Sequence, residues 1–223
     1  MSTAPTGEPV MRDSGEGSGA GLGDGHGEGF DAVVLAGGRA RRMDGADKPG
    51  LTVGGRTLVE RVAEAVRDAR RLIVVGPPRA ELPHATVVRE DPPGSGPVPA
   101  LRAGLAEVRA PWLALLAADM PFLLPGHVAA LLDAARRAGA PGAVLVDAEG
   151  REQWLAGCWR TAGLRAALTG YRGASLRGLL GPLAPARVSP GPGGAERERP
   201  AWYDCDTPGA LAHARRLLTE GEE

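Results

Sequence analysis

Two adjacent glycines and four cationic side chains lie in one short segment of this 223-residue chain. The segment runs from Leu35 to Lys48 and reads LAGGRARRMDGADK. Paired glycines let backbone N–H groups approach an anion closely, and the arginines and the lysine supply charge to balance several phosphates. The pattern lacks both the glycine, lysine and hydroxyl spacing of a P-loop and the G-x-G-x-x-G of dinucleotide binders. We therefore predict a different kind of phosphate-binding loop.

Lys48 is the only lysine among the 26 basic residues of the chain, and the others are all arginines. An ammonium is a compact point charge, whereas a guanidinium is longer, planar and forked. Arginine therefore cannot replace a lysine that places its charge on one phosphate without shifting the geometry. The single lysine therefore raises the hypothesis that Lys48 has a role that arginine cannot fill.

Two carboxylates follow predicted strands. Asp119 comes directly after the apolar run 112–118, and Asp91 lies in a Gly- and Pro-rich segment, 89–101, that leads into a predicted helix. Oxygen ligands beside phosphates suit Mg²⁺, which often binds only one or two carboxylates. The start of a helix offers free N–H groups to an anionic ligand. Both segments are thus candidates for nucleotide or metal binding.

The elements that must position these residues alternate between short apolar runs and amphipathic stretches, which is typical of an α/β domain with a mainly parallel sheet. Ligands bind such sheets at the carboxyl ends of the strands, so the glycine segment and Asp119 are expected at one edge. Strands are predicted at 32–35, 51–53, 72–75, 86–88, 112–117, 143–146, 153–158 and 202–205. Helices are predicted at 58–69, 97–108, 127–137, 161–168 and 175–180, and from Pro208 onward with Thr207 as N-cap.

The first 29 residues are Gly-rich with scattered acids and no long apolar run, so we predict a disordered tail at 1–29 and a single domain at 30–223. The chain has 27 acidic and 26 basic residues. The tail holds five of the acidic residues and one of the basic residues, so residues 30–223 carry a net charge of +3. Neither a nucleic-acid nor a membrane partner is expected from this composition. We expect a cytoplasmic protein in which Cys158 and Cys205 are reduced thiols.

The segment from Leu35 to Lys48 resembles the signature loop L-A-G-G-x-x-x-R-M-x-G-x-D-K of the molybdenum cofactor guanylyltransferase family. Related cytidylyltransferases usually have a shorter spacing without the aspartate found here as Asp47. The sequence Asp119-Met120-Pro121 is similar to the metal-binding motif of the family, and 89–101 is similar to its E-D-x…G-P-L-x-G segment. The resemblance extends in order from Leu35 to Pro208.

This resemblance implies a three-layer α/β/α fold of the nucleotide-diphospho-sugar transferase type with a mostly parallel sheet. It implies an Mg²⁺-dependent enzyme that transfers GMP from GTP to molybdopterin and releases pyrophosphate. The implied catalytic residues are Lys48, Asp119 and Arg42. The implied nucleotide-binding residues are Leu35, Ala36, Gly37, Gly38, Lys48, Asp91 and Asp119. The implied metal ligand is Asp119, with Asp206 as a second candidate. Cofactor-assembly proteins and molybdoenzyme apoproteins are further candidate partners.

The chain departs from the family pattern at several positions. Asp204 and Asp206 stand where the family has asparagines in its N-x-N-T-P segment, and Gly76 stands where some members have an asparagine. An ionised Asp206 would bind Mg²⁺ more strongly but repel an acceptor phosphate, so its role is open. The base and the acceptor are also open. The alternatives are a CTP-dependent cytidylyltransferase, a nucleotidyltransferase for another phosphorylated acceptor, and a non-catalytic nucleotide-binding scaffold.

Overall fold

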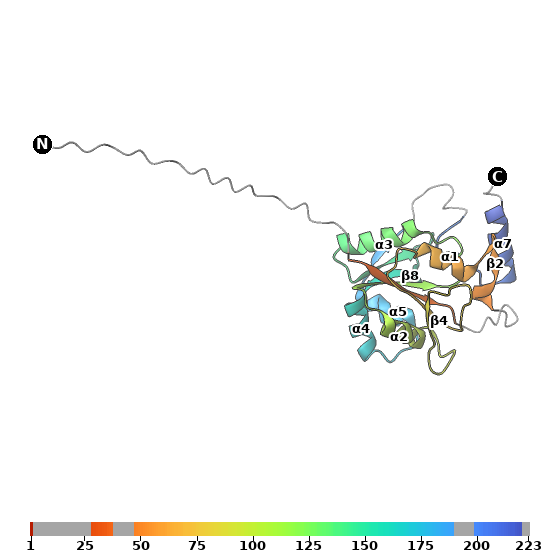
Figure 1. The fold of residues 1–223 in the computed structure, drawn as a ribbon, viewed down its shortest axis with the longest axis horizontal. Helices are drawn as coiled ribbons and strands as arrows, with labels where there is room; N and C mark the ends of the chain where they lie inside the picture. Colours follow the sequence, from red (N-terminus) through yellow and green to blue (C-terminus); the bar gives the residue numbers. More distant parts are fainter. Residues whose placement is uncertain (2–27, 38–46, 190–198, 220–223) are drawn as a thin grey trace.

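In a computed structural model of the protein, the described residues are Met1 and the ranges 28–37, 47–189 and 199–219 (Figure 1). In these ranges a seven-stranded sheet forms the centre, in the order β5-β4-β1-β6-β8-β7-β9. The strands are β1 (Phe30–Leu35), β4 (Leu72–Val75), β5 (Thr86–Val88), β6 (Trp112–Ala117), β7 (Gly142–Val146), β8 (Glu152–Arg160) and β9 (Ala186–Val188). The predicted tail at 1–29 falls almost entirely outside the described residues, and the division into tail and domain stays a prediction.

The sheet is mostly parallel, as predicted. β1 pairs in parallel with β4 and β6, β4 with β5, and β7 with β9. Within the described part of this seven-stranded sheet only β8 runs the other way, antiparallel to both β6 and β7. Leu35 is in register with Val75 on one side and with Ala117 on the other. The chain therefore leaves β1, β4 and β6 at the same edge of the sheet, where the candidate residues were expected.

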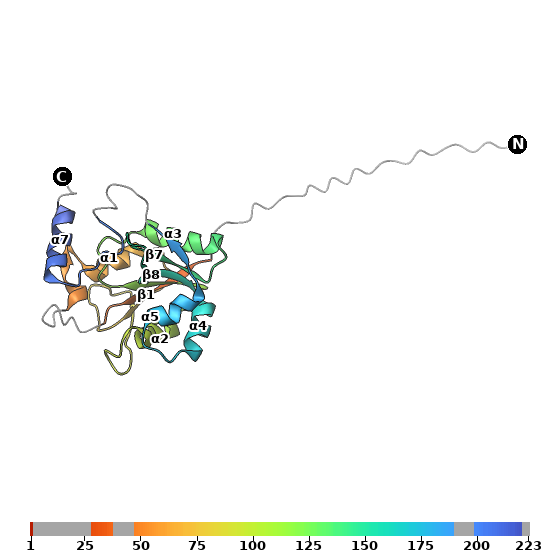
Figure 2. The same cartoon turned by 180° about the vertical axis from the view of Figure 1, so that it is seen from behind.

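Helices cover both faces of the sheet, which gives the predicted three layers (Figures 1 and 2). Side chains of α1 (Leu58–Ala65) and α3 (Pro125–Arg137) share a buried cluster with Val34. Side chains of α2 (Pro97–Glu107), α4 (Thr161–Gly170) and α5 (Leu176–Leu180) share a second cluster with Val33. Successive residues of a strand point to opposite faces, so β1 is buried from both sides.

A small third cluster lies beside the sheet edge. The helix α7 (Pro208–Thr219) packs there on the hairpin β2 (Thr52–Val53) and β3 (Arg56–Thr57), through buried side chains that include Cys205. The Thr207 hydroxyl accepts a hydrogen bond of 3.1 Å from the Ala210 N–H, which confirms Thr207 as the N-cap. No helix in the described ranges is long and apolar enough to cross a membrane.

Two expectations about the elements were wrong, and the short strands β3 and β9 were not predicted. Residues 202–205 are not a strand. The Tyr203 N–H closes a turn by donating to the Pro200 carbonyl, and the Cys205 N–H donates to the carbonyl of Asp119, two residues after β6. α1 ends at Ala65 instead of residue 69, because Arg70 N–H bonds to the Phe30 carbonyl and turns the chain toward β4. The short edge strand β9 was not predicted, since it is only three residues long and one of them is the exposed Arg187.

Candidate active site

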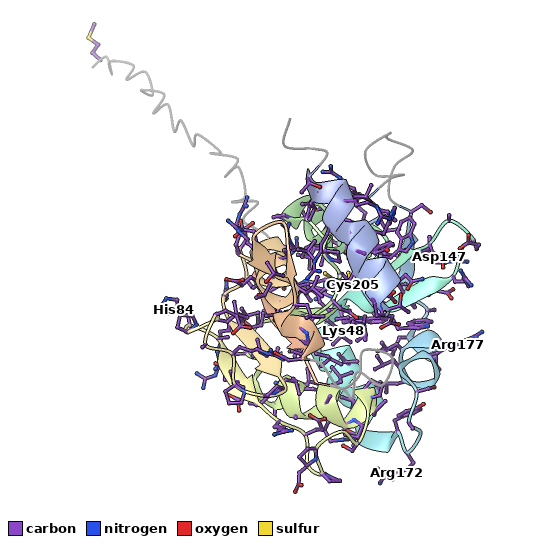
Figure 3. The ribbon with its side chains drawn as sticks, turned by 90° about the vertical axis from the view of Figure 1, so that its right-hand side faces the viewer. Lys48, His84, Asp147, Arg172, Arg177 and Cys205 are labelled. Atoms are coloured by element: carbon purple, nitrogen blue, oxygen red, sulfur yellow. The ribbon has the colours of Figure 1, made fainter. Side chains whose placement is uncertain are left out.

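Three charged side chains from separate parts of the chain meet at the carboxyl edge of the sheet. The Lys48 ammonium forms ion pairs with the carboxylates of both Asp119 and Asp206. Lys48 begins the one-turn helix η2 (Lys48–Gly50), Asp119 follows β6, and Asp206 precedes α7. The side chains of Lys48 and Asp119 are 14% and 17% exposed, and that of Asp206 is 49% exposed. Figure 3 shows Lys48 in the middle of this face, below Cys205.

The surroundings of Lys48 keep its side chain charged. Partial burial acts to lower the pKa of Lys48, but the charges and hydrogen bonds of Asp119 and Asp206 outweigh it, so the pKa lies above its ordinary value. Lys48 is therefore an ammonium at neutral pH. It can donate hydrogen bonds to phosphate oxygens, and it cannot act as a general base.

Cys205 holds the segment before α7 against β6. Its N–H donates a hydrogen bond of 3.2 Å to the Asp119 carbonyl, and its side chain is fully buried. Burial, followed by the nearby Asp119 charge, raises the pKa of the Cys205 thiol to about 12. Both Cys205 and Cys158 are free thiols, as expected. Cys205 is thus protonated at neutral pH and positions Asp206, which lies next to it in the chain.

A buried arginine that the sequence analysis did not identify anchors the segment before Lys48. Arg79, in the connection between β4 and β5, pairs through both terminal nitrogens with the Asp47 carboxylate, and one of these hydrogen bonds is 2.7 Å long. The Arg79 side chain is only 3% exposed, and it also lies 3.4 Å from the Ala36 carbonyl. The Asp47 side chain is 59% exposed, but its bidentate pairing with a buried arginine fixes its position. Nothing in the pattern of 25 similar arginines distinguishes Arg79.

The exits of β1 and β4 are closely packed, and this packing explains one departure from the family pattern. Ala36 N–H donates to the Val75 carbonyl at 2.8 Å. Gly76 has φ +155°, and a Cβ there would lie 2.8 Å from the Ala36 carbonyl carbon and oxygen. Any side chain at position 76 would therefore collide with the backbone of Ala36, the residue that follows β1. An asparagine cannot stand at this position without moving that backbone.

The other predicted site residues are placed as follows. Leu35, Ala36 and Gly37 lie at the exit of β1, at the same edge as Asp119. Asp91 is exposed after β5, and in the described ranges no hydrogen bond or ion pair links it to Lys48, Asp119 or Asp206. Gly38 and Arg42 lie outside the described residues. The structure thus brings together Lys48, Asp119 and Asp206, and leaves Asp91 apart from them.

The two carboxylates fit a hard divalent cation. Asp119 and Asp206 both contact the same cationic atom, so one cation could replace the ammonium between them. No group of three or more His, Cys, Asp or Glu that could hold a metal exists among the described residues. The donor set is therefore two carboxylates, which leaves room for phosphate oxygens and water. This is the arrangement that Mg²⁺ prefers at nucleotide sites.

A mostly parallel sheet covered on both faces, with the exit of β1, a partly buried lysine and two carboxylates at its carboxyl edge, defines the nucleotide-diphospho-sugar transferase fold, which is a fold of nucleotidyltransferases. Residues 32–187 match the family described as the MobA-like NTP transferase domain. The chain belongs to this family.

Relatives agree with this placement. A molybdenum cofactor guanylyltransferase from Shewanella sp. (strain MR-4) is 33% identical over 129 residues, which cover 56% of this chain and 65% of that protein. A probable molybdenum cofactor guanylyltransferase from Mycolicibacterium paratuberculosis is 36% identical over 137 residues, which cover 58% of this chain and 68% of that one. The chain therefore spans about two thirds of these relatives. The crystal structure of molybdopterin-guanine dinucleotide biosynthesis protein A from Archaeoglobus fulgidus has the same fold, with a TM-score of 0.65, 18% identity, and coverage of 85% of this chain and 99% of that one.

Proposed function

We propose that this protein transfers GMP from GTP to the phosphate of molybdopterin, forming a guanine dinucleotide cofactor and pyrophosphate. The observation that carries the proposal is the meeting of Lys48, Asp119 and Asp206 at the carboxyl edge of the sheet, beside the exit of β1. The printed names of the relatives, molybdenum cofactor guanylyltransferases, support GTP and molybdopterin as the substrates.

The reaction requires charge neutralisation and positioning more than a protein nucleophile. An oxygen of the acceptor phosphate forms a bond to the α-phosphorus of GTP, and the bond from that phosphorus to the β-phosphate oxygen breaks. The Lys48 ammonium donates to an α-phosphate oxygen, where negative charge develops. Asp47 and Arg79 hold the chain before Lys48 in place. Arg42, outside the described residues, remains a predicted second cation for the phosphates.

Asp119 and Asp206 would hold the divalent cation, which we propose to be Mg²⁺ and which neutralises triphosphate oxygens when bound. We assign Asp119 as the principal ligand because its side chain is more buried than that of Asp206. Asp206 is then the second carboxylate. In this role it faces the cation and not the acceptor phosphate, which resolves the repulsion expected from an aspartate at this position.

The test is a pyrophosphate-release assay with each of the four NTPs, with and without molybdopterin and Mg²⁺. We expect pyrophosphate release with GTP and with none of the other three NTPs. We also expect this release only when molybdopterin and Mg²⁺ are both present. Release with CTP would instead identify a cytidylyltransferase. GTP turnover with a different phosphorylated acceptor would show that molybdopterin is not the acceptor. Nucleotide binding without any turnover would indicate a non-catalytic scaffold. Cytoplasmic localisation and binding to cofactor-assembly proteins or molybdoenzyme apoproteins stay predictions.

A further inference from the structure

Glu90, two residues after the end of β5, is a buried carboxylate, and one of its oxygens has no partner among the described residues. The residue is only 7% exposed. Its Oε1 accepts a hydrogen bond of 2.8 Å from the Gly94 N–H, whereas its Oε2 is buried and has no hydrogen-bond partner within the ranges 28–37, 47–189 and 199–219. A buried acceptor without a donor costs free energy, and most buried polar atoms in proteins are paired. The described residues supply no donor to Oε2, so a bound ligand is a candidate to supply one.

The unpaired oxygen lies against the first glycine of the phosphate-binding segment. A Cβ built on Gly37 would lie 3.7 Å from Oε1 and 3.9 Å from Oε2 of Glu90. The same Cβ would lie 3.7 Å from the Val75 carbonyl. The Glu90 carboxylate thus borders the exit of β1, next to residues predicted to contact the nucleotide. Its neighbour Asp91 is exposed to solvent.

We propose that Oε2 of Glu90 accepts hydrogen bonds from the guanine base of the bound nucleotide and so selects GTP. This inference rests on the proposed function. On its Watson–Crick edge guanine carries two adjacent donors, N1–H and the 2-amino group, which can converge on one oxygen. Adenine and cytosine place a ring nitrogen acceptor beside their amino group, and uracil places carbonyl acceptors on both sides of its N–H. A carboxylate oxygen therefore attracts guanine and meets repelling lone pairs on the others.

The two oxygens of Glu90 have separable roles. Oε1 fixes the turn before α2 by its bond to Gly94, and this role is structural. In Glu90→Gln the amide oxygen can keep that bond, while an NH₂ donor replaces the unpaired acceptor. The variant therefore preserves the turn and inverts the hydrogen-bonding character of the atom that faces Gly37.

The experiment measures the dissociation constants of GTP, ITP and XTP by calorimetry with Mg²⁺ and without an acceptor. ITP lacks the 2-amino group, and XTP has a carbonyl in its place. We expect the unchanged protein to prefer GTP over ITP by about tenfold, the effect of one charge-assisted hydrogen bond. Glu90→Gln is expected to bind GTP about tenfold more weakly and to bind XTP more tightly than the unchanged protein does. Glu149→Gln, in an exposed turn, is the control and is expected to leave all three constants unchanged.

Equal affinity of the unchanged protein for GTP and ITP would overturn the inference without relying on any variant. An unaltered order of GTP, ITP and XTP in Glu90→Gln, at a melting temperature like that of the unchanged protein, would also overturn it. Either result would leave the proposed GTP reaction standing if pyrophosphate release still requires GTP. A preference of the unchanged protein for CTP over GTP, in contrast, would overturn both the proposed function and this inference.

Discussion

Two carboxylates of this protein, Asp119 and Asp147, show how a reactive charge differs from a structural one; Figure 3 labels Asp147 and Lys48, the partner of Asp119. Asp147, in the turn between β7 and β8, accepts hydrogen bonds from its own turn: from the Glu149 N–H at 3.0 Å, and from the Arg151 N–H and side chain at 2.8 and 2.9 Å. The charge of Asp119 is instead balanced by Lys48, which comes from a distant part of the sequence. A charge that is balanced within its own turn keeps its partners, whereas a bound cation can replace Lys48 as the distant partner of Asp119.

The strongest test of this contrast is Asp119→Asn. Removal of one carboxylate of the proposed cation site is expected to lower kcat for pyrophosphate release by about 10²- to 10³-fold, the usual effect of removing an electrostatic group at the reacting centre. Asp147→Asn, the matched control, is expected to keep full activity. Equal losses in the two variants would mean that Asp119 is no more reactive than a turn residue.

Lys48→Arg keeps the charge and changes its shape. We expect GTP binding, measured by calorimetry, to be retained and the rate of transfer to fall by about 10²-fold, because the forked guanidinium cannot occupy the position of the ammonium between Asp119 and Asp206. Full activity of this variant would contradict the argument that a lysine is required here.

Asp206→Asn is expected to have a smaller effect, because this side chain is more exposed than that of Asp119. The half-saturating Mg²⁺ concentration for pyrophosphate release is expected to rise by about tenfold, with little change in kcat at saturating Mg²⁺. Loss of one carboxylate also removes part of what raises the pKa of Lys48. A proportional loss of kcat that excess Mg²⁺ does not restore would instead place Asp206 at the reacting atoms.

The smallest effect is expected on stability alone. The Arg151 N–H, more than any other group, lowers the pKa of Asp147 below its ordinary value. A carboxyl whose pKa is lowered in the folded state stabilises the fold above its ordinary pKa, and this stability is lost as the pH falls through the folded-state pKa. Asp147→Asn should therefore lower the melting temperature slightly at pH 7, and this difference should be smaller at a second pH below the ordinary pKa of an aspartate. A constant difference at both pH values, measured by thermal denaturation, would show that ionisation is not the cause.

The sequence predicted the parts of the molecule that depend on local patterns. The apolar runs of β1 and β6 predicted buried strands, and the ends of these strands placed Gly37 and Asp119 at one edge. The resemblance also singled out Lys48 and Asp206, which the structure brings together. These features could be predicted because strand ends and motifs are visible in short stretches of sequence.

The features that were not predicted depend on partners far apart in the chain. Arg79 pairs with Asp47, which is 32 positions away in the sequence. The Oε2 atom of Glu90 becomes a candidate ligand contact only because the fold places it beside Gly37. The family resemblance gave the nucleotide role to Asp91, but it is the neighbouring Glu90 that is buried. Successive residues of an extended segment point to opposite sides, and the sequence of two adjacent acids does not tell which one faces inward.

The ion pairs of the only lysine have a practical consequence for spectroscopy. Selective isotopic labelling of lysine would place a single labelled ammonium in the whole protein, at Lys48. Its nuclear magnetic resonance signal would need no assignment. It would also come directly from the atom that contacts Asp119 and Asp206, so one isolated peak would move when a cation binds those carboxylates or when a phosphate replaces them beside Lys48.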